Sequence, residues 1–282
     1  MKKWIIVGLI IVFFNDAAAG KCLEVNKLTS NISYQIELLS WEEVNKLLPK
    51  KSIFTVIDVD SGMKFRVQRR AGSQHADVQP LTATDTKIMK KIYNGKWSWK
   101  RRAIIVMHND RWIAASMHGM PHGAGALNNQ FPGHFCIHFL GSTTHQSDNI
   151  DLAHKLMVLK AAGVLEEFLM NAKLEELIHC FITGLKQHDQ RITSFVSTEQ
   201  LNWREIFHLI ENVTLLNVKT KQLNVNDQLF LSLPVEVEWY LQGEGRTKIT
   251  SELRLVRSSP YEQWKIAAKD FFIENNVLQK NE

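Results

Sequence analysis

The sequence has few cysteines, no apolar run long enough to cross a bilayer and no strong excess of one charge. Its three cysteines cannot all pair with one another, so at least one thiol is free or pairs between chains. A net charge of +5 over 282 residues is too diffuse to indicate nucleic acid as a partner. A hydrophobic content of 45% with 22% charged residues is typical of a globular protein and excludes a disordered chain.

The N-terminus has the pattern of a secretory signal peptide. Lys2 and Lys3 precede the apolar run Trp4–Phe14, and Ala17–Ala19 offers a site for cleavage. The run is too short to span a bilayer, so we expect export without stable membrane insertion after cleavage. The signal peptide would comprise residues 1–19, and an uncleaved membrane anchor is the alternative.

The first half of the chain reads as β-rich with short helices. A capping box predicts a helix from Ser40 to about Leu48, and a second helix starts near Thr82. Alternating apolar residues predict two hairpins and one further strand, at 54–57 with 63–68, 103–107 with 112–117, and 135–140.

From Asp151 the pattern changes to helices followed by long strands. The expected helices cover 152–169, 174–185 and 203–210, and the expected strands cover 213–218, 229–233, 235–241, 249–256 and 264–272. This order predicts an α+β arrangement with helices on an antiparallel sheet. It resembles the cone of the NTF2-like fold, which implies ligand binding or a dimer through this region. We expect two domains, at 28–160 and 165–278.

A histidine and a cysteine in the first half stand where a catalytic pair is expected. His118 ends an apolar run that reads as a strand, and Cys136 lies on the strand that returns, with His134 two residues before it. The connection between them is rich in glycine and proline and therefore reads as a loop. These are the parts of a thiol nucleophile and its base.

The segment resembles the catalytic signature of the L,D-transpeptidases, the cysteine enzymes that cross-link bacterial peptidoglycan. The resemblance rests on His118-Gly119 followed by His134, Cys136 and Ile137. The sequence departs from that signature at three positions, which are Gly133, Phe135 and His138. The resemblance implies a β-sandwich catalytic domain, a cell-wall or cell-envelope location, and acyl transfer on peptidoglycan stem peptides through a Cys136 thioester without a cofactor.

The same resemblance implies roles for the neighbouring residues. His118 would take the thiol proton, with its other ring nitrogen held by the Gly119 carbonyl, and His134 would orient the substrate or the loop. A nearby imidazolium would lower the pKa of the Cys136 thiol. Other side chains would bind the substrate. We expect these to be Phe135, His138 and, in place of the missing arginine of the signature, Arg101 and Arg102.

The histidines also permit a zinc-dependent cell-wall amidase or peptidase. Eight of the eleven histidines lie between His75 and His154. A zinc ion would take His75 or Asp77 with two further ligands and leave one position for water. The candidates for those two ligands are His118, His122, His134 and His138. The sequence lacks the His-Glu-x-x-His motif. A non-catalytic envelope module is the third hypothesis. We expect three other histidines to be exposed polar residues, namely His108, His145 and His154.

Overall fold

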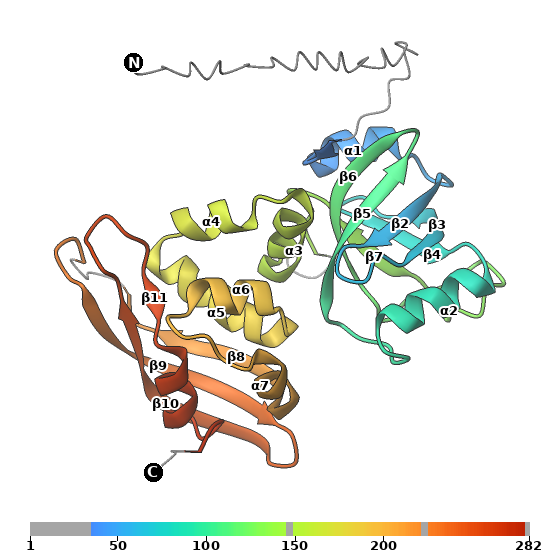
Figure 1. Ribbon diagram of the computed structural model, residues 1–282. Coiled ribbons are helices and arrows are strands. Elements are labelled where there is room, and N and C mark those ends of the chain that lie inside the picture. Colours follow the sequence, from blue (N-terminus) through green and yellow to red (C-terminus); the bar gives the residue numbers. More distant parts are fainter. Residues whose placement is uncertain (1–34, 145–148, 221–224, 280–282) are drawn as a thin grey trace, which may run out of the picture. The chain divides into compact units, whose positions relative to one another are not determined.

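The computed structural model describes residues 35–144, 149–220 and 225–279 (Figure 1). Ser33–Glu282 forms one compact unit. The predicted signal peptide and Cys22 lie outside the described residues, so export stays a prediction. Within the described ranges, no helix is both long and apolar enough to cross a membrane.

Seven strands and two helices form the β-rich part of the chain. The strands are β1 (Ile36–Glu37), β2 (Ile53–Asp58), β3 (Lys64–Ala71), β4 (Ala76–Pro80), β5 (Arg101–His108), β6 (Arg111–His118) and β7 (Phe135–His138). The helices are α1 (Trp41–Leu47) and α2 (Ala83–Ile92). The strand order is β1-β6-β5-β2-β3-β4-β7, and β6 also pairs with β7. Because that pairing closes the sheet on itself, six strands form a barrel, and the expected sandwich is wrong.

The barrel is filled by one face of each strand. Strand β2 alternates between buried and more exposed residues, and so does most of β3, as the sequence pattern predicted. Strands β4 and β7 are buried along their whole length, because residues outside the barrel cover their outer face as well. The side chains that could take part in catalysis or metal binding lie on this outer, covered face.

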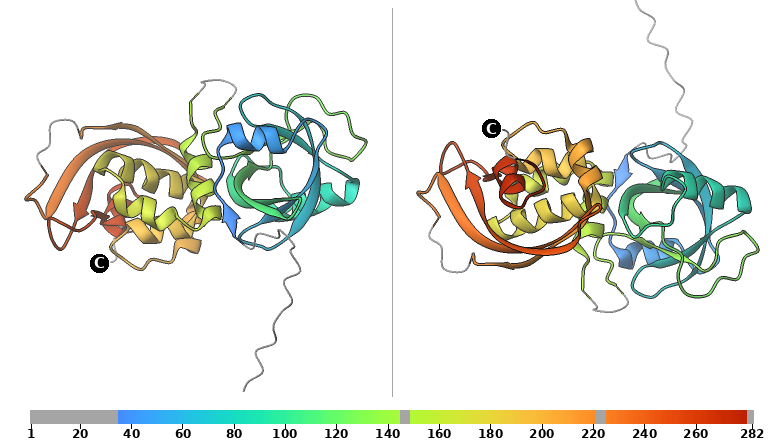
Figure 2. Two further views of the ribbon diagram at one scale, coloured as in Figure 1. Left: turned by 90° about the horizontal axis from the view of Figure 1, so that it is seen from above. Right: turned by 90° about the horizontal axis from the view of Figure 1, so that it is seen from below.

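The described residues from Leu152 to Glu274 form helices packed on a second sheet. The helices are α3 (Leu152–Ala162), α4 (Leu165–Asn171), α5 (Leu174–Gln187), α6 (Gln190–Val196), α7 (Trp203–Leu209) and α8 (Ala268–Glu274). The strands are β8 (Ile210–Val218), β9 (Phe230–Leu241), β10 (Gly245–Val256) and β11 (Lys265–Ile266), in the antiparallel order β11-β10-β9-β8. The sheet curves around the helices (Figure 2), so the predicted α+β arrangement is confirmed.

Three predicted strands in this region need correction. The segments at 229–233 and 235–241 form one strand. Pro234, which has no N–H group, lies within it opposite Glu252 of β10. The pairing with β8 reaches only to Val235, so the N–H that Pro234 lacks faces no partner. The predicted strand at 264–272 is wrong. It is a two-residue strand followed by α8, whose buried residues Ala268, Phe271 and Phe272 fall at helical spacing.

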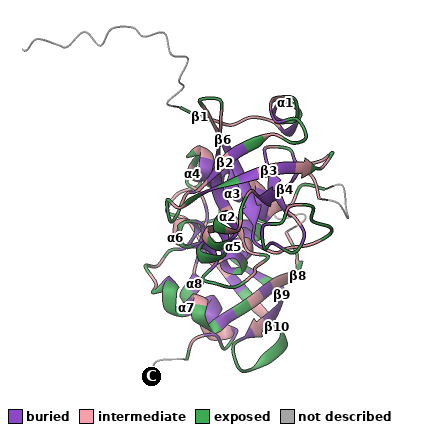
Figure 3. Ribbon diagram, turned by 90° about the vertical axis from the view of Figure 1, so that its right-hand side faces the viewer, coloured by how far each residue is buried: buried purple, intermediate pink, exposed green. Residues whose placement is uncertain are grey.

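Helix α3 packs against β5 and β6 of the barrel and against α5 of the helical layer. Its residues are buried almost throughout (Figure 3). The predicted boundary between residues 160 and 165 therefore lies beside a helix that both regions share. The division into two domains stays a prediction.

The cap of α2 fastens this helix to the barrel and provides a test of the fold. Asp85 accepts hydrogen bonds from the backbone N–H groups of Thr82 (2.9 Å) and of Arg66 on β3 (2.8 Å). We expect Asp85→Ala to lower the free energy of unfolding by about 2 kcal/mol, because both N–H groups lose their acceptor. Denaturant unfolding measures the loss. The control Asp227→Ala, in an exposed turn, should be neutral, and equal effects of the two changes would contradict this role.

Candidate active site

The strand register brings several reactive and ionisable side chains together on the outer face of the barrel. Phe135 and Ile137 of β7 belong to the barrel core, so the alternate residues Cys136 and His138 point away from it. Cys136 lies opposite Asp77 of β4, and His138 lies opposite Ser116 of β6. Residues opposite each other share a face, so three strands contribute to one site.

The loop between β6 and β7 folds back over this face. His122 and His134 exchange backbone hydrogen bonds of 2.9 Å in both directions. Gly123 and Gly133 both have positive φ, and a Cβ at Gly133 would lie 2.5 Å from the His122 carbonyl oxygen. Only glycine permits that approach. The Gln79 side chain also donates to the Gly133 carbonyl at 2.8 Å, which ties the loop to β4.

This loop places His122 against the thiol. Its Nε2 lies 3.3 Å from Cys136 Sγ, and its Nδ1 lies 3.2 Å from the Met120 carbonyl oxygen. Because a carbonyl only accepts, a neutral His122 carries its proton on Nδ1. The lone pair of Nε2 then faces the thiol, which is the arrangement a general base requires.

His118 lies in the same site with the opposite tautomer. Its Nδ1 accepts a hydrogen bond from the Met120 N–H at 3.3 Å, so a neutral His118 carries its proton on Nε2. Burial, with a contribution from His122, lowers the pKa of His118 well below its usual value. His118 is therefore neutral at pH 7 and placed as a hydrogen-bond donor. Its role as the base stays a prediction.

Gly119 has a steric role in the structure. Its N–H donates to the Ser98 carbonyl at 2.8 Å, and a Cβ at this position would lie 2.5 Å from the Tyr93 ring. The His118 ring nitrogen that was expected to meet the Gly119 carbonyl receives the Met120 N–H instead. A glycine is thus needed here for close packing on the ring.

A carboxylate lies beside the thiol. Asp77 Oδ1 is 3.6 Å from Cys136 Sγ, 3.3 Å from His75 Nε2 and 3.8 Å from His134 Nε2. Burial, and after it the charge of Asp77, raises the pKa of the Cys136 thiol. This is opposite to the predicted lowering. The resting side chain is therefore a thiol and not a thiolate.

A cavity of about 570 Å³ opens onto these groups. It is lined by His75, Trp99, Arg101, His118, His122, Cys136, His138, Thr144, Asp151 and His154. Trp99 is 50% exposed and its ring centroid is 4.7 Å from that of His118. The cavity therefore combines an aromatic surface with a thiol and several imidazoles.

Three imidazoles form a stack along one side of the cavity. The His138 ring lies 4.5 Å from His75 and 3.7 Å from His154, measured between centroids. His154 is 3% exposed, and its Nδ1 lies 2.9 Å from Ser116 Oγ. The expectation that His154 is an exposed polar residue is wrong, and burial lowers its pKa well below the usual value. His145 lies outside the described residues.

Two of the four predicted substrate-binding residues line the cavity and two do not. His138 and Arg101 line it, and an Arg101 Nη2 atom lies 2.8 Å from an Asp151 carboxylate oxygen. Phe135 lies in the barrel core with its ring 5.7 Å from Phe131. Arg102 points to the opposite face of β5 and forms two hydrogen bonds with the buried Asp58, because neighbours on a strand face opposite ways.

The donor atoms at this site could hold a metal ion in two ways. One group is His118, His122 and Cys136, and the other is His75, Cys136 and His138. In each group the three donor atoms lie within 4.8 Å of one another. Imidazole nitrogen and thiolate sulfur are the ligands that zinc prefers. Neither of these two groups is the set considered from the sequence, because the first lacks His75 and Asp77 and the second has His75 with only one of the four other candidates. Both groups use Cys136, which was not among the zinc ligands considered.

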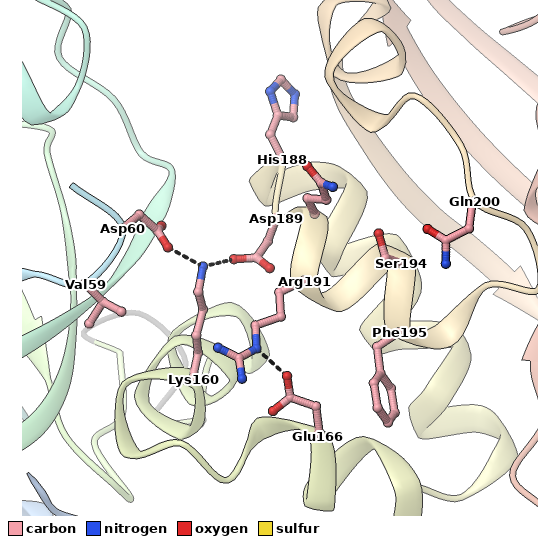
Figure 4. Close-up of a pocket in the computed structure, with 11 residues that line it drawn as sticks. Val59, Asp60, Lys160, Glu166, His188, Asp189, Arg191, Ser194, Phe195 and Gln200 are labelled. Carbon is pink, nitrogen blue, oxygen red and sulfur yellow. Dashed lines mark hydrogen bonds and ion pairs between the residues drawn. The ribbon is translucent and has the colours of Figure 1, made fainter.

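A second cavity, of about 890 Å³, is lined by charged side chains that pair with one another (Figure 4). Lys160 Nζ lies 2.8 Å from an Asp60 oxygen and 2.6 Å from an Asp189 oxygen, and Arg191 pairs with Glu166. The Lys160 bridge joins the turn after β2 to α3 and to the start of α6. These charges are structural, so the site at Cys136 is the better candidate for chemistry.

Comparison with protein-family models, with curated proteins and with solved structures gave no match to this chain.

The position of Asp77 predicts the pH dependence of thiol reactivity. We expect Asp77→Asn to lower the pH at which Cys136 becomes alkylated, because removing the charge removes a cause of the raised pKa. Iodoacetamide labelling, followed by mass spectrometry of the peptide that contains Cys136, measures this midpoint. The exposed control Asp227→Asn should leave it unchanged. A midpoint that Asp77→Asn does not move would contradict the inferred coupling between carboxylate and thiol.

Proposed function

We propose that the protein is an exported cysteine acyltransferase that acts on peptidoglycan stem peptides, with Cys136 as nucleophile and His122 as base. The observation that carries this proposal is the 3.3 Å contact between Cys136 Sγ and His122 Nε2, with Nδ1 of the same ring held by the Met120 carbonyl. The ring is thereby oriented with the correct nitrogen toward the sulfur.

In the first step Cys136 gives its proton to His122 Nε2 while the sulfur attacks a substrate carbonyl carbon. His122 then returns the proton to the leaving amine, which leaves a thioester on Cys136. An acceptor amine, or water, attacks the thioester and restores the thiol. His118, neutral and protonated at Nε2, would donate a hydrogen bond to the oxyanion. As the motif resemblance implies, the backbone N–H groups around Phe135 and Cys136 would also donate to the oxyanion.

The raised pKa of Cys136 makes this reaction depend on the base. A buried thiol beside a carboxylate does not ionise at rest, so proton transfer must accompany attack on the substrate. His122 supplies the acceptor for that proton at the right atom. Removal of the base should therefore cost more than it would in an enzyme with a preformed thiolate.

The substrate class rests on the motif resemblance, the predicted export and the cavity lining. Stem peptides carry both carboxylates and amines, and the cavity lining includes the ion pair of Arg101 and Asp151, whose two groups would exchange partners to bind such a substrate. Trp99, half exposed at the same cavity, offers a flat apolar surface. The NTF2-like cone and a dimer through it remain proposals. They are supported by the helices on the curved sheet, and sedimentation at twice the chain mass would test the dimer.

Substitution of the histidines distinguishes the base from its neighbour. We expect His122→Ala to slow acylation of Cys136 by p-nitrophenyl acetate and cross-linking of isolated peptidoglycan by about 10²-fold or more. His118→Ala should have a smaller effect, and Cys136→Ser should abolish thioester formation. Intact-protein mass spectrometry follows the acyl-enzyme.

The control His108→Ala changes a histidine at the far end of β5 and should leave acylation unchanged. If His118→Ala slows acylation more than His122→Ala, then His118 is the base and the assignment to His122 fails.

A zinc-dependent amidase or peptidase is the second candidate function. The specific observation in its favour is the pair of three-donor groups that share Cys136. Neutral imidazoles such as His118 can bind a metal at pH 7 without first losing a proton. A bound zinc would activate water for attack on an amide.

Metal binding separates the two candidates. If the second holds, protein purified without chelator should retain about one zinc per chain, and Cys136→Ser and His122→Ala should lower that content, because they remove ligands. Elemental analysis after dialysis measures it, and His108→Ala is the control. Full activity of metal-free protein on peptidoglycan would exclude the zinc mechanism, and loss of both zinc and activity on chelation would exclude the thiol mechanism.

A further inference from the structure

Lys100, which directly precedes β5, has a buried ammonium group with no hydrogen-bond partner in the described part of the chain. Its backbone N–H donates to the Ser98 hydroxyl, but nothing there accepts from Nζ. Burial lowers the pKa of Lys100 to about 8. Buried polar groups are nearly always paired, and an unpaired ammonium away from water is costly. This group therefore requires an explanation.

Lys100 is one of the residues that line a cavity of about 400 Å³ beside α7 and the start of β8. The lining residues are Lys100, His188, Arg204, Phe207, His208, Ile210, Glu211 and Gln242. Lys100 and Arg204 are cations and Glu211 is the acidic residue of this lining, whereas burial lowers the pKa of His188 to about 4 and leaves that ring neutral at pH 7. The cavity therefore has an excess of positive charge, in contrast to the paired charges around Lys160.

The walls of this cavity hold its basic groups in place. His188 donates from Nε2 to the Ile210 carbonyl at 2.8 Å, and its ring stacks on Phe207 with centroids 5.0 Å apart. Arg204 lies on α7 with its side chain exposed, so its guanidinium is accessible from solvent. Of the two cations in the lining, the Lys100 ammonium is therefore buried and the Arg204 side chain is exposed.

We propose that this cavity is an anion site that takes a phosphate or carboxylate group, with Lys100 binding the anion and Arg204 closing on it from solvent. An ammonium supplies a compact charge with three donors, and a guanidinium supplies a planar fork that fits two oxygens. The volume exceeds that of a single oxyanion, so the ligand is a small molecule that carries such a group.

The site lies next to the proposed catalytic cavity but does not share its chemistry. The neighbours of Lys100, Trp99 and Arg101, both line the cavity of Cys136. The Arg101 N–H donates to the Gln187 side chain at 2.6 Å, one residue before His188. The anion site does not rest on the proposed acyl transfer, because no group in it belongs to the Cys136 cluster.

Calorimetric titration tests the site with two probes, inorganic phosphate and succinate. We expect the full chain to bind at least one of them, and Lys100→Met to weaken that binding about tenfold or more, because the buried charge is lost. Arg204→Gln should weaken it less. Lys186→Met, an exposed lysine near the end of α5, is the matched control. Preference for phosphate or for succinate identifies which anion the site takes.

If a variant binds neither probe, thermal unfolding shows whether it is still folded. Without added anion, Lys100→Met should be at least as stable as the wild type, because an unpaired buried charge has been removed. The probe that binds should raise the melting temperature of the wild type and not that of Lys100→Met. Binding of neither probe by the wild type, or equal binding by Lys100→Met and Lys186→Met, would overturn the proposal.

Discussion

The pairing of β7 with both β4 and β6 is the constraint on which the site depends. It closes the barrel, and it sets which face each residue of the strand presents. Phe135 and Ile137 fill the barrel, so Cys136 and His138 must face outward beside Asp77 and Ser116. A shift of one residue would exchange these two sets and put a thiol in the core. The buried aromatic and aliphatic side chains therefore fix the position of the nucleophile.

Burial then sets the protonation states at the site. The loop from β6 covers the outer face of β4 and β7, and His154 of α3 stacks on His138, so the thiol and several imidazoles are removed from water. Removal from water favours neutral forms, which explains the lowered pKa of His118 and His154 and the raised pKa of Cys136. A site of neutral groups suits reactions that begin with proton transfer, or binding of a metal that prefers neutral imidazole.

The sequence was sufficient for features that depend on local pattern. Capping residues predicted α1 and α2, and alternation predicted the hairpins that contain β2, β3, β5 and β6. The sequence also predicted that His118 and Cys136 share one site, because the loop between them is long enough to return the chain to a neighbouring strand. The same alternation places the neighbours Arg101 and Arg102 on opposite faces of β5, so they cannot both face one cavity.

Features that depend on distant contacts could not be read in this way. His122 reaches Cys136 because its backbone pairs with His134 and because Gln79 of β4 holds the loop, and neither contact has a local signal. The burial of His154 depends on packing of α3 against β6. Closure of the barrel depends on the pairing of β6 with β7. Each joins segments whose separation in the sequence gives no periodic pattern.

The proposed chemistry requires that His122 present an unprotonated Nε2 to the Cys136 thiol. Long-range ¹H–¹⁵N NMR of protein labelled at histidine nitrogen distinguishes the two neutral tautomers of each ring, and His122→Gln assigns the signals. We expect His122 to carry its proton on Nδ1 at pH 7 and its Nε2 signal to shift when Cys136 is replaced by serine. A His122 ring protonated on Nε2, with signals insensitive to that replacement, would contradict it.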